Sequence, residues 1–300
     1  MNTRIVFAGS PQVSVHYLTA LITSEFDVVS VITREDSPQG RKRVVAPTPV
    51  ALAAVELGIP VIKANTLRDV EIPPADLGIV VAYGGLVPER LLDAPTRGWV
   101  NVHFSVLPEY RGAAPVQRAL WDGRADTGIT IFRLVRELDA GPIYFSRSIP
   151  FDPHETASEA LDRVAQNTTD DLVATARLVV ADALQPHDQE GEPSMAPKFS
   201  REDGRIDWTL PASTIATRVR AVTSEPGAFT TLGGEPFGIV RAATDPGESV
   251  GVGRVVMSND RVVTGTGDGN VELIDVKPAG KAVMAATDWW RGVRDTVTFE

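Results

Sequence analysis

Residues 4–11 have the sequence RIVFAGSP, and this stretch decides the first part of the fold. The apolar run over 4–8 predicts a buried strand. The glycine, serine and proline that follow predict a turn, with Ser10 as the N-cap of a helix and proline as its first residue. A helix is expected to continue to about residue 24, so the chain opens with a strand–turn–helix unit.

Further apolar, β-branched runs follow this unit, at 27–33, 59–63, 77–83 and 98–104. Helix-like stretches such as 49–57 and 86–93 separate them. Strands that alternate with helices imply a parallel sheet, so we expect a doubly wound, Rossmann-like α/β domain.

Residues 129–134 and 142–151 predict a later pair of strands in the same domain. The Ala, Leu and Val spacing over about 155–185 predicts one long amphipathic helix. We expect this helix to close a catalytic domain that spans residues 1–185.

The composition changes after this helix. Residues 186–205 are rich in Pro, Gly, Glu and Asp without apolar periodicity, which is typical of a linker. Beyond a helix-like stretch at 211–222, short strands are broken by glycines. We therefore expect a second domain over 206–300 that forms a small β-barrel, for which an OB-like barrel is one option.

Composition excludes several function classes. The 300 residues contain no cysteine, so disulfides, thiolate catalysis and cysteine zinc sites are ruled out. No apolar run has the roughly 18 residues that a membrane span needs. The start of the chain has no signal-peptide pattern, so a cytoplasmic protein is expected. The four histidines show no close pairing with other ligands, and no metal site is expected.

The net charge of −10 gives no general attraction to phosphate. A nucleic-acid partner would therefore need a local basic patch, and Arg41, Lys42 and Arg43 form one in a loop rich in Pro and Gly. Taken alone, such a trio is usually a solvated surface loop. The first turn, GSPQVSV, lacks the G-x-G-x-x-G pattern, which argues against a nicotinamide cofactor.

Polar residues at the end of one predicted strand are the strongest sign of chemistry. Asn101 and His103 alternate with apolar residues, so both side chains should point to one face, at the edge where open α/β sheets bind ligands. Taken singly, His103 would be a structural histidine and Asn101 a turn cap. Asp139, in the tight turn LDAGP between two later strands, could reach back to the imidazole.

This set contains no side-chain nucleophile, so it suits a reaction in which the substrate supplies one. Formyl transfer from a folate to an amine is such a reaction. An asparagine amide can donate to the oxyanion that develops. A histidine oriented by a carboxylate can move the proton near neutral pH.

The stretch NVHFSVLPEYRGAAPVQRAL, followed by LDAGPI, resembles the signature of the folate-dependent formyltransferases, in particular those that act on methionyl-tRNA. The resemblance extends over the whole chain, from RIVFAGSPQVS to APKFSREDGRIDW and KPAGKAVM. It implies a doubly wound formyltransferase domain and a carboxyl-terminal OB-like barrel. It also implies 10-formyltetrahydrofolate as the one-carbon donor, and initiator methionyl-tRNA as the acceptor for translation initiation.

The resemblance also implies roles for particular residues. Asn101, His103 and Asp139 take the catalytic positions. The positions of the family's folate-contacting loop are Ser105, Val106, Leu107 and Pro108, with Val106 in place of the usual leucine. The acceptor end of the tRNA is expected at Arg41, Lys42 and Arg43.

Basic residues of the second domain are candidate phosphate contacts, provided that they share a face. They are Lys198, Arg205, Arg218, Arg220, Lys277 and Lys281. A monomer is expected.

Three alternatives remain open from the sequence. The amine could belong to a small acceptor, such as glycinamide ribonucleotide or a nucleotide-linked amino sugar. Water could replace the amine, which would make the protein a formylfolate hydrolase. The fold could also serve a noncatalytic RNA-binding protein, although the intact Asn101, His103 and Asp139 argue against that alternative.

Overall fold

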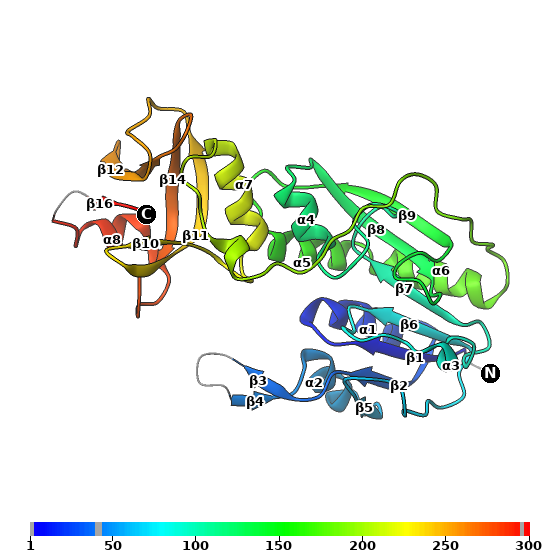
Figure 1. The fold of residues 1–300 in the computed structure, drawn as a ribbon. Helices are drawn as coiled ribbons and strands as arrows, with labels where there is room; N and C mark the ends of the chain where they lie inside the picture. The colour runs from blue at the N-terminus through cyan, green and yellow to red at the C-terminus, as the bar shows by residue number, and fades with distance from the viewer. Residues whose placement is uncertain (1–2, 40–43, 295–296) are drawn as a thin grey trace. The chain divides into compact units, whose positions relative to one another are not determined.

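A computed structural model describes residues 3–39, 44–294 and 297–300 (Figure 1). The chain divides into two compact units. The first comprises Met1–Pro115, Thr127–Ile149 and Leu161–Ala196, and the second comprises Val116–Asp126, Pro150–Ala160 and Pro197–Glu300. The domain boundaries expected from the sequence stay a prediction.

The first unit is built on a seven-stranded sheet with the order β5-β2-β1-β6-β7-β8-β9. Its strands are β1 (Arg4–Gly9), β2 (Asp27–Thr33), β5 (Val61–Lys63), β6 (Leu77–Val81), β7 (Trp99–His103), β8 (Asp126–Arg133) and β9 (Ile143–Pro150). The strands from β5 to β7 pair in parallel, and β8 runs antiparallel to β7. The strand order reverses at β1 and β6, which is where doubly wound sheets bind ligands. The predicted doubly wound fold is confirmed.

Helix α1 of this unit packs against both α2 and α6. The helices in this part of the chain are α1 (Gln12–Thr23), α2 (Pro49–Glu56), α3 (Glu89–Leu92), α5 (Ala157–Asn167) and α6 (Thr169–Val180). The prediction of one helix over 155–185 is wrong. The backbone of Thr168 leaves the helical region, and its hydroxyl bonds to the Val164 carbonyl and the Tyr17 hydroxyl.

Ser10 does not cap α1, which corrects the sequence prediction. The helix begins after Pro11, without a hydrogen bond from a capping side chain. The Ser10 hydroxyl instead donates to the carbonyl of Tyr83, at 2.8 Å, and accepts from the Arg34 amide. The first turn is thereby tied to the loop that follows β6.

Trp99 fixes the start of β7, the strand that carries the candidate site. It is buried, and its indole N–H donates to the Leu91 carbonyl of α3 at 2.7 Å. The ring fits because Gly78 lies opposite, where a Cβ atom would come within 2.2 Å of it. Any larger residue at position 78 would displace the ring.

The second unit contains a curled antiparallel sheet with the order β10-β11-β14-β13-β12-β16, and β15 pairs with β14. Its strands are β10 (Ala228–Leu232), β11 (Glu235–Asp245), β12 (Arg254–Ser258), β13 (Arg261–Gly265), β14 (Asn270–Lys277), β15 (Met284–Ala285) and β16 (Val297–Thr298). The amide of Glu300, just beyond β16, donates to Thr231 of β10 at 3.1 Å. The two ends of the sheet are thus joined, and the predicted small barrel is confirmed.

The remaining elements belong to neither large sheet. They are the hairpin strands β3 (Ser37–Gln39) and β4 (Val44–Ala46), the helices α4 (Pro115–Trp121), α7 (Ala212–Val222) and α8 (Ala286–Trp290), and the 3-10 turn Glu202–Gly204. In the second unit, α7 packs on β11 and β14. Among the described residues, no helix combines the length and the apolar character that crossing a membrane requires.

Candidate functional site

Strand β7 places Asn101 and His103 on one face of the sheet, as the period of two predicts. In the register, Asn101 lies opposite Val80 of β6 and Phe132 of β8, and His103 is the last residue of β7. His103 is 5% exposed, and Asn101 is half-buried. The Phe132 ring packs edge-on against the imidazole. The strand therefore presents one amide and one imidazole at its carboxyl end.

The two ring nitrogens of His103 have different partners. Nε2 lies 2.8 Å from the carbonyl oxygen of Tyr110. Since a carbonyl can only accept, Nε2 must carry a hydrogen for this bond to form. Nδ1 lies 3.7 Å from Oδ2 of Asp139. A proton gained by the neutral ring would therefore settle on Nδ1, beside the carboxylate.

Burial lowers the pKa of His103, because the protonated ring loses solvation. The charge of Asp139 and the carbonyl of Tyr110 oppose this shift but do not cancel it. Burial thus favours the neutral form of the imidazole. It can accept a proton, and the adjacent carboxylate would then balance its charge.

Asp139 lies in the turn between β8 and β9, with a left-handed backbone at φ 48°. The Gly112 amide donates to Oδ2 at 2.8 Å, which fixes the carboxylate toward the imidazole. Gly141 is required two residues later, because a Cβ atom there would lie 1.7 Å from the Arg133 carbonyl oxygen. The LDAGP turn thus brings Asp139 to His103, as expected from the sequence.

A cavity of about 450 Å³ opens beside this group in the first unit. Asn101 and Asp139 both line it. The other lining residues are Thr66, Arg68, Val80, Gly85, Leu86, Val87, Pro88, Glu89, Leu92, Leu134, Val135, Arg136, Glu137 and Leu138. His103 is not among them. Asn101 and Asp139 therefore border the cavity directly, and the imidazole is next to Asp139 without bordering the cavity.

The segment Ser105 to Pro108 does not line this cavity. Ser105 and Leu107 are buried, and Val106 is 38% exposed. The Leu107 amide donates to the Thr130 hydroxyl, which donates in turn to the Ser105 carbonyl. A role for these residues in folate contact stays a prediction.

Two walls of the cavity, residues 85–89 and 134–138, were not predicted from the sequence. A signal for the first was present: GGLVPE follows the buried strand β6 at the edge where parallel sheets bind ligands. The second wall directly precedes Asp139 in the chain, but its residues form no pattern that predicts a binding site.

Arg41, Lys42 and Arg43 lie outside the described residues. On either side of them, β3 and β4 pair antiparallel, with Gln39 opposite Val44. Their predicted contact with RNA stays a prediction.

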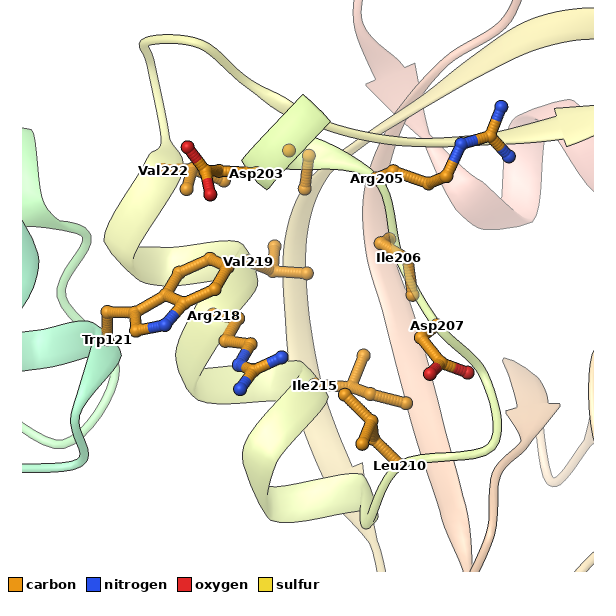
Figure 2. A pocket seen from close by; sticks show the side chains of 12 residues that line it. Trp121, Asp203, Arg205, Ile206, Asp207, Leu210, Ile215, Arg218, Val219 and Val222 are labelled. Atoms are coloured by element: carbon orange, nitrogen blue, oxygen red, sulfur yellow. The ribbon is translucent and has the colours of Figure 1, made fainter. Parts of the chain in front are cut away.

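The second unit has a hollow between α4, α7 and residues 203–210, lined by the arginines of positions 205 and 218 (Figure 2). The guanidinium carbon of Arg218 lies 4.5 Å from the centroid of the Trp121 ring, and the Arg205 side chain points away from that ring. The Arg218 Nε atom is buried without a hydrogen-bond partner among the described residues. Arg218 is thus a half-buried cation beside an aromatic face.

The other predicted phosphate contacts also lie in the second unit, but with different surroundings. Arg205 pairs with Glu202, and Arg220 donates to the Glu155 carbonyl. Lys198, Lys277 and Lys281 are exposed. Whether these six residues share one face stays a prediction.

Comparison with known proteins covers both units. The family model described as "Formyl transferase" matches residues 3–176, and "Formyl transferase, C-terminal domain" matches residues 198–294. The chain is 49% identical over 294 residues to methionyl-tRNA formyltransferase of Leifsonia xyli subsp. xyli, covering 96% of this chain and 97% of that one. It is 44% identical over 301 residues to the protein of the same name from Nocardioides sp., covering 97% and 95% of the two chains.

Solved structures share the fold at lower identity. HypX from Aquifex aeolicus, in complex with tetrahydrofolic acid, is 20% identical with a TM-score of 0.70. The match covers 100% of this chain and 51% of HypX, so the chain spans about half of that protein's length. Methionyl-tRNA formyltransferase from Clostridium thermocellum is 18% identical with a TM-score of 0.58, over 82% of this chain and 95% of that one.

Proposed function

The chain belongs to the formyl transferase family, and from this premise we propose that it transfers a formyl group from 10-formyltetrahydrofolate to the amino group of initiator methionyl-tRNA. One observation supports the chemistry most strongly: Asn101 and Asp139 line the same cavity, and Nδ1 of His103 lies 3.7 Å from Oδ2 of Asp139. The relatives that cover nearly the whole chain carry the name of this activity.

The reaction begins when the methionyl amine attacks the formyl carbon, so that a C–N bond forms and the carbonyl oxygen becomes an oxyanion. The Asn101 amide donates a hydrogen bond to this oxyanion. The attacking nitrogen loses a proton to the His103–Asp139 pair, where Nδ1 holds it beside the carboxylate. The bond from carbon to N10 of the folate then breaks as N10 takes up the proton. The products are formylmethionyl-tRNA and tetrahydrofolate.

The donor occupies the cavity beside Asn101. Its volume of about 450 Å³ lies in the range of small-molecule sites. Apolar walls such as Leu86 and Val87 suit a flat ring system. The lining also holds two cations, Arg68 and Arg136, beside the carboxylates of Glu89, Glu137 and Asp139. The folates bound to structural neighbours agree in chemical class, since HypX was solved with tetrahydrofolic acid. Within the described residues, no group of acidic and histidine side chains is arranged to hold a metal ion.

RNA binds to the second unit and to the loop that contains Arg41, Lys42 and Arg43. The whole chain carries a net charge of −10, so contact with a polyanion depends on local cations such as Arg218. We also propose a cytoplasmic location and a monomeric state.

The acceptor is tested by competition. Purified protein is given labelled 10-formyltetrahydrofolate together with equal concentrations of initiator methionyl-tRNA, glycinamide ribonucleotide and a nucleotide-linked amino sugar. We expect the label on the methionyl-tRNA. Label on either small amine would overturn the proposed acceptor, and release of free formate without transfer would indicate a hydrolase.

The basic loop has its own test. The double variant Arg41→Ala and Arg43→Ala should bind tRNA more weakly. The slope of log K against log salt should fall by about 0.9 for each phosphate contact that is lost. An unchanged slope would indicate that these residues do not contact the tRNA and form only a solvated surface loop.

A further inference from the structure

Residues 187–196 run along the first unit and bond to both loops that contact His103. Backbone hydrogen bonds join His187 to Ile143 in both directions, at 2.7 and 3.0 Å. Further along, the Arg111 amide donates to the Ser194 carbonyl at 2.8 Å, and the Ala196 amide donates to the Arg111 carbonyl at 2.7 Å. The segment therefore connects the start of β9, just after the LDAGP turn, with the loop that follows His103.

Gln189 occupies the middle of this segment, and both ends of its side-chain amide are engaged. Nε2 donates to the carbonyl oxygens of Asp139 and Gly141, each at 2.8 Å. Oε1 accepts from Arg111, at 2.6 Å from Nη2 and 3.2 Å from Nε. A single amide thus spans the turn of Asp139 and the side chain of Arg111.

The hydrogen bonds from Gln189 go to a turn whose backbone conformation is energetically unfavourable. Asp139 has a left-handed backbone, which a residue other than glycine adopts at a cost in free energy. Its carbonyl and that of Gly141 converge on one –NH₂ group, which can satisfy both. The same turn sets the position of Oδ2, 3.7 Å from Nδ1 of His103.

We propose that Gln189 is a positioning residue for Asp139: its amide holds the LDAGP turn so that the carboxylate faces the imidazole and the cavity. Arg111 acts with it, because it fixes the Oε1 end and so orients the –NH₂ end toward the turn. This inference rests on the proposed function, in which Asp139 works with His103. Gln189 itself does not line the cavity.

Three variants separate positioning from general stability. Gln189→Glu keeps the acceptor for Arg111 but places a carboxylate oxygen against two carbonyls. Gln189→Met keeps the length of the side chain and removes both sets of bonds. Glu190→Gln is the matched control, since it exchanges the same two functional groups at an exposed neighbouring position.

The experiment measures kcat, the KM for each substrate and the melting temperature of the full-length protein. Because a displacement of about 1 Å at a reacting group can cost about 100-fold, we expect Gln189→Glu and Gln189→Met to lower kcat by about 10- to 100-fold. The KM for the folate should not change, because Gln189 does not contact the cavity. Gln189→Glu should melt closer to the wild-type temperature than Gln189→Met does, since its carboxylate still pairs with Arg111. Glu190→Gln should match wild type throughout.

Two outcomes would overturn the inference. One is a wild-type kcat in Gln189→Glu and Gln189→Met. The other is a loss of activity that follows the melting temperature across the variants, since that would indicate a structural role alone. Failure of the proposed function would look different, because the wild-type protein itself would then transfer no formyl group to methionyl-tRNA.

Discussion

The two units hold their charged groups in opposite ways. In the first, His103 and Asp139 are 5% and 8% exposed. His103 donates a hydrogen bond to the Tyr110 carbonyl, and Asp139 accepts one from the Gly112 amide. In the second, guanidinium groups rest on aromatic rings. Arg118 lies 3.7 Å from the centroid of Phe199, and Arg218 lies 4.5 Å from that of Trp121.

This difference separates chemistry from binding. Buried groups with fixed partners are preorganised, so they can stabilise charge that develops during a reaction without rearranging. Cations on aromatic faces keep part of their donor capacity and suit sequence-tolerant contact with phosphates and bases. We therefore expect changes at Asn101, His103 and Asp139 to act on turnover, and changes at the arginines of the second unit to act on RNA affinity.

Removing the oxyanion donor should have the largest effect. Asn101→Ala should lower kcat by about 100- to 1,000-fold, because the amide acts only once the oxyanion has formed. The KM values and RNA affinity should be close to wild type. Steady-state kinetics and an RNA-binding titration on the same preparation check this, and an equal loss in kcat and in RNA affinity would contradict it.

Removing the carboxylate should have the next largest effect and should also change the pH profile. The general base must be neutral, so kcat/KM falls as the pH drops through the pKa of His103. Burial holds that pKa below its ordinary value of about 6.5, so the wild-type midpoint should also lie below it. Asp139 raises the pKa, hence Asp139→Asn should move the midpoint further toward acid while lowering the plateau by about 100-fold.

The pH profile of kcat/KM reports groups of the free enzyme, so it is the appropriate measurement. A variant midpoint above that of wild type would contradict the sign of the Asp139 contribution. A wild-type midpoint well above the ordinary value would contradict the effect of burial on His103.

The smallest effect is expected in the second unit. Arg218→Ala should weaken RNA binding by several-fold and reduce the slope of log K against log salt by about 0.9, since one phosphate contact is lost. The rate at saturating RNA should be unchanged. The matched control is Arg254→Ala, because Arg254 is an exposed cation on β12 outside the hollow. Equal salt slopes for the two variants would show that the hollow does not bind RNA.

Most of the fold was predictable because apolar residues recur along its strands and helices with the regular period of each type of element. The alternation in β7 also predicted that Asn101 and His103 share a face. The break at Thr168 was not predictable, because it depends on a hydroxyl bond to Tyr17, which is far away in sequence. Ser10 failed as a cap for the same reason, since its hydroxyl bonds to Tyr83.

In the candidate site, too, residues in local sequence patterns were predictable and residues held by contacts far away in sequence were not. Asp139 could be linked to His103 because a turn between neighbouring strands leaves few directions for a side chain. Gln189 could not be found, because its segment has the composition of a linker and no apolar period. Its bonds to Asp139 and Arg111 join parts of the chain that are 50 and 78 residues apart.

The most direct test of the central claim is single-turnover formyl transfer by His103→Gln at saturating initiator methionyl-tRNA, with RNA affinity measured in parallel. Glutamine keeps a donor for the Tyr110 carbonyl but cannot accept a proton at the position of Nδ1. We predict a fall in rate of at least about 100-fold with unchanged RNA affinity. A wild-type rate, or a loss of affinity in proportion to the loss of rate, would contradict the assignment of chemistry to the first unit.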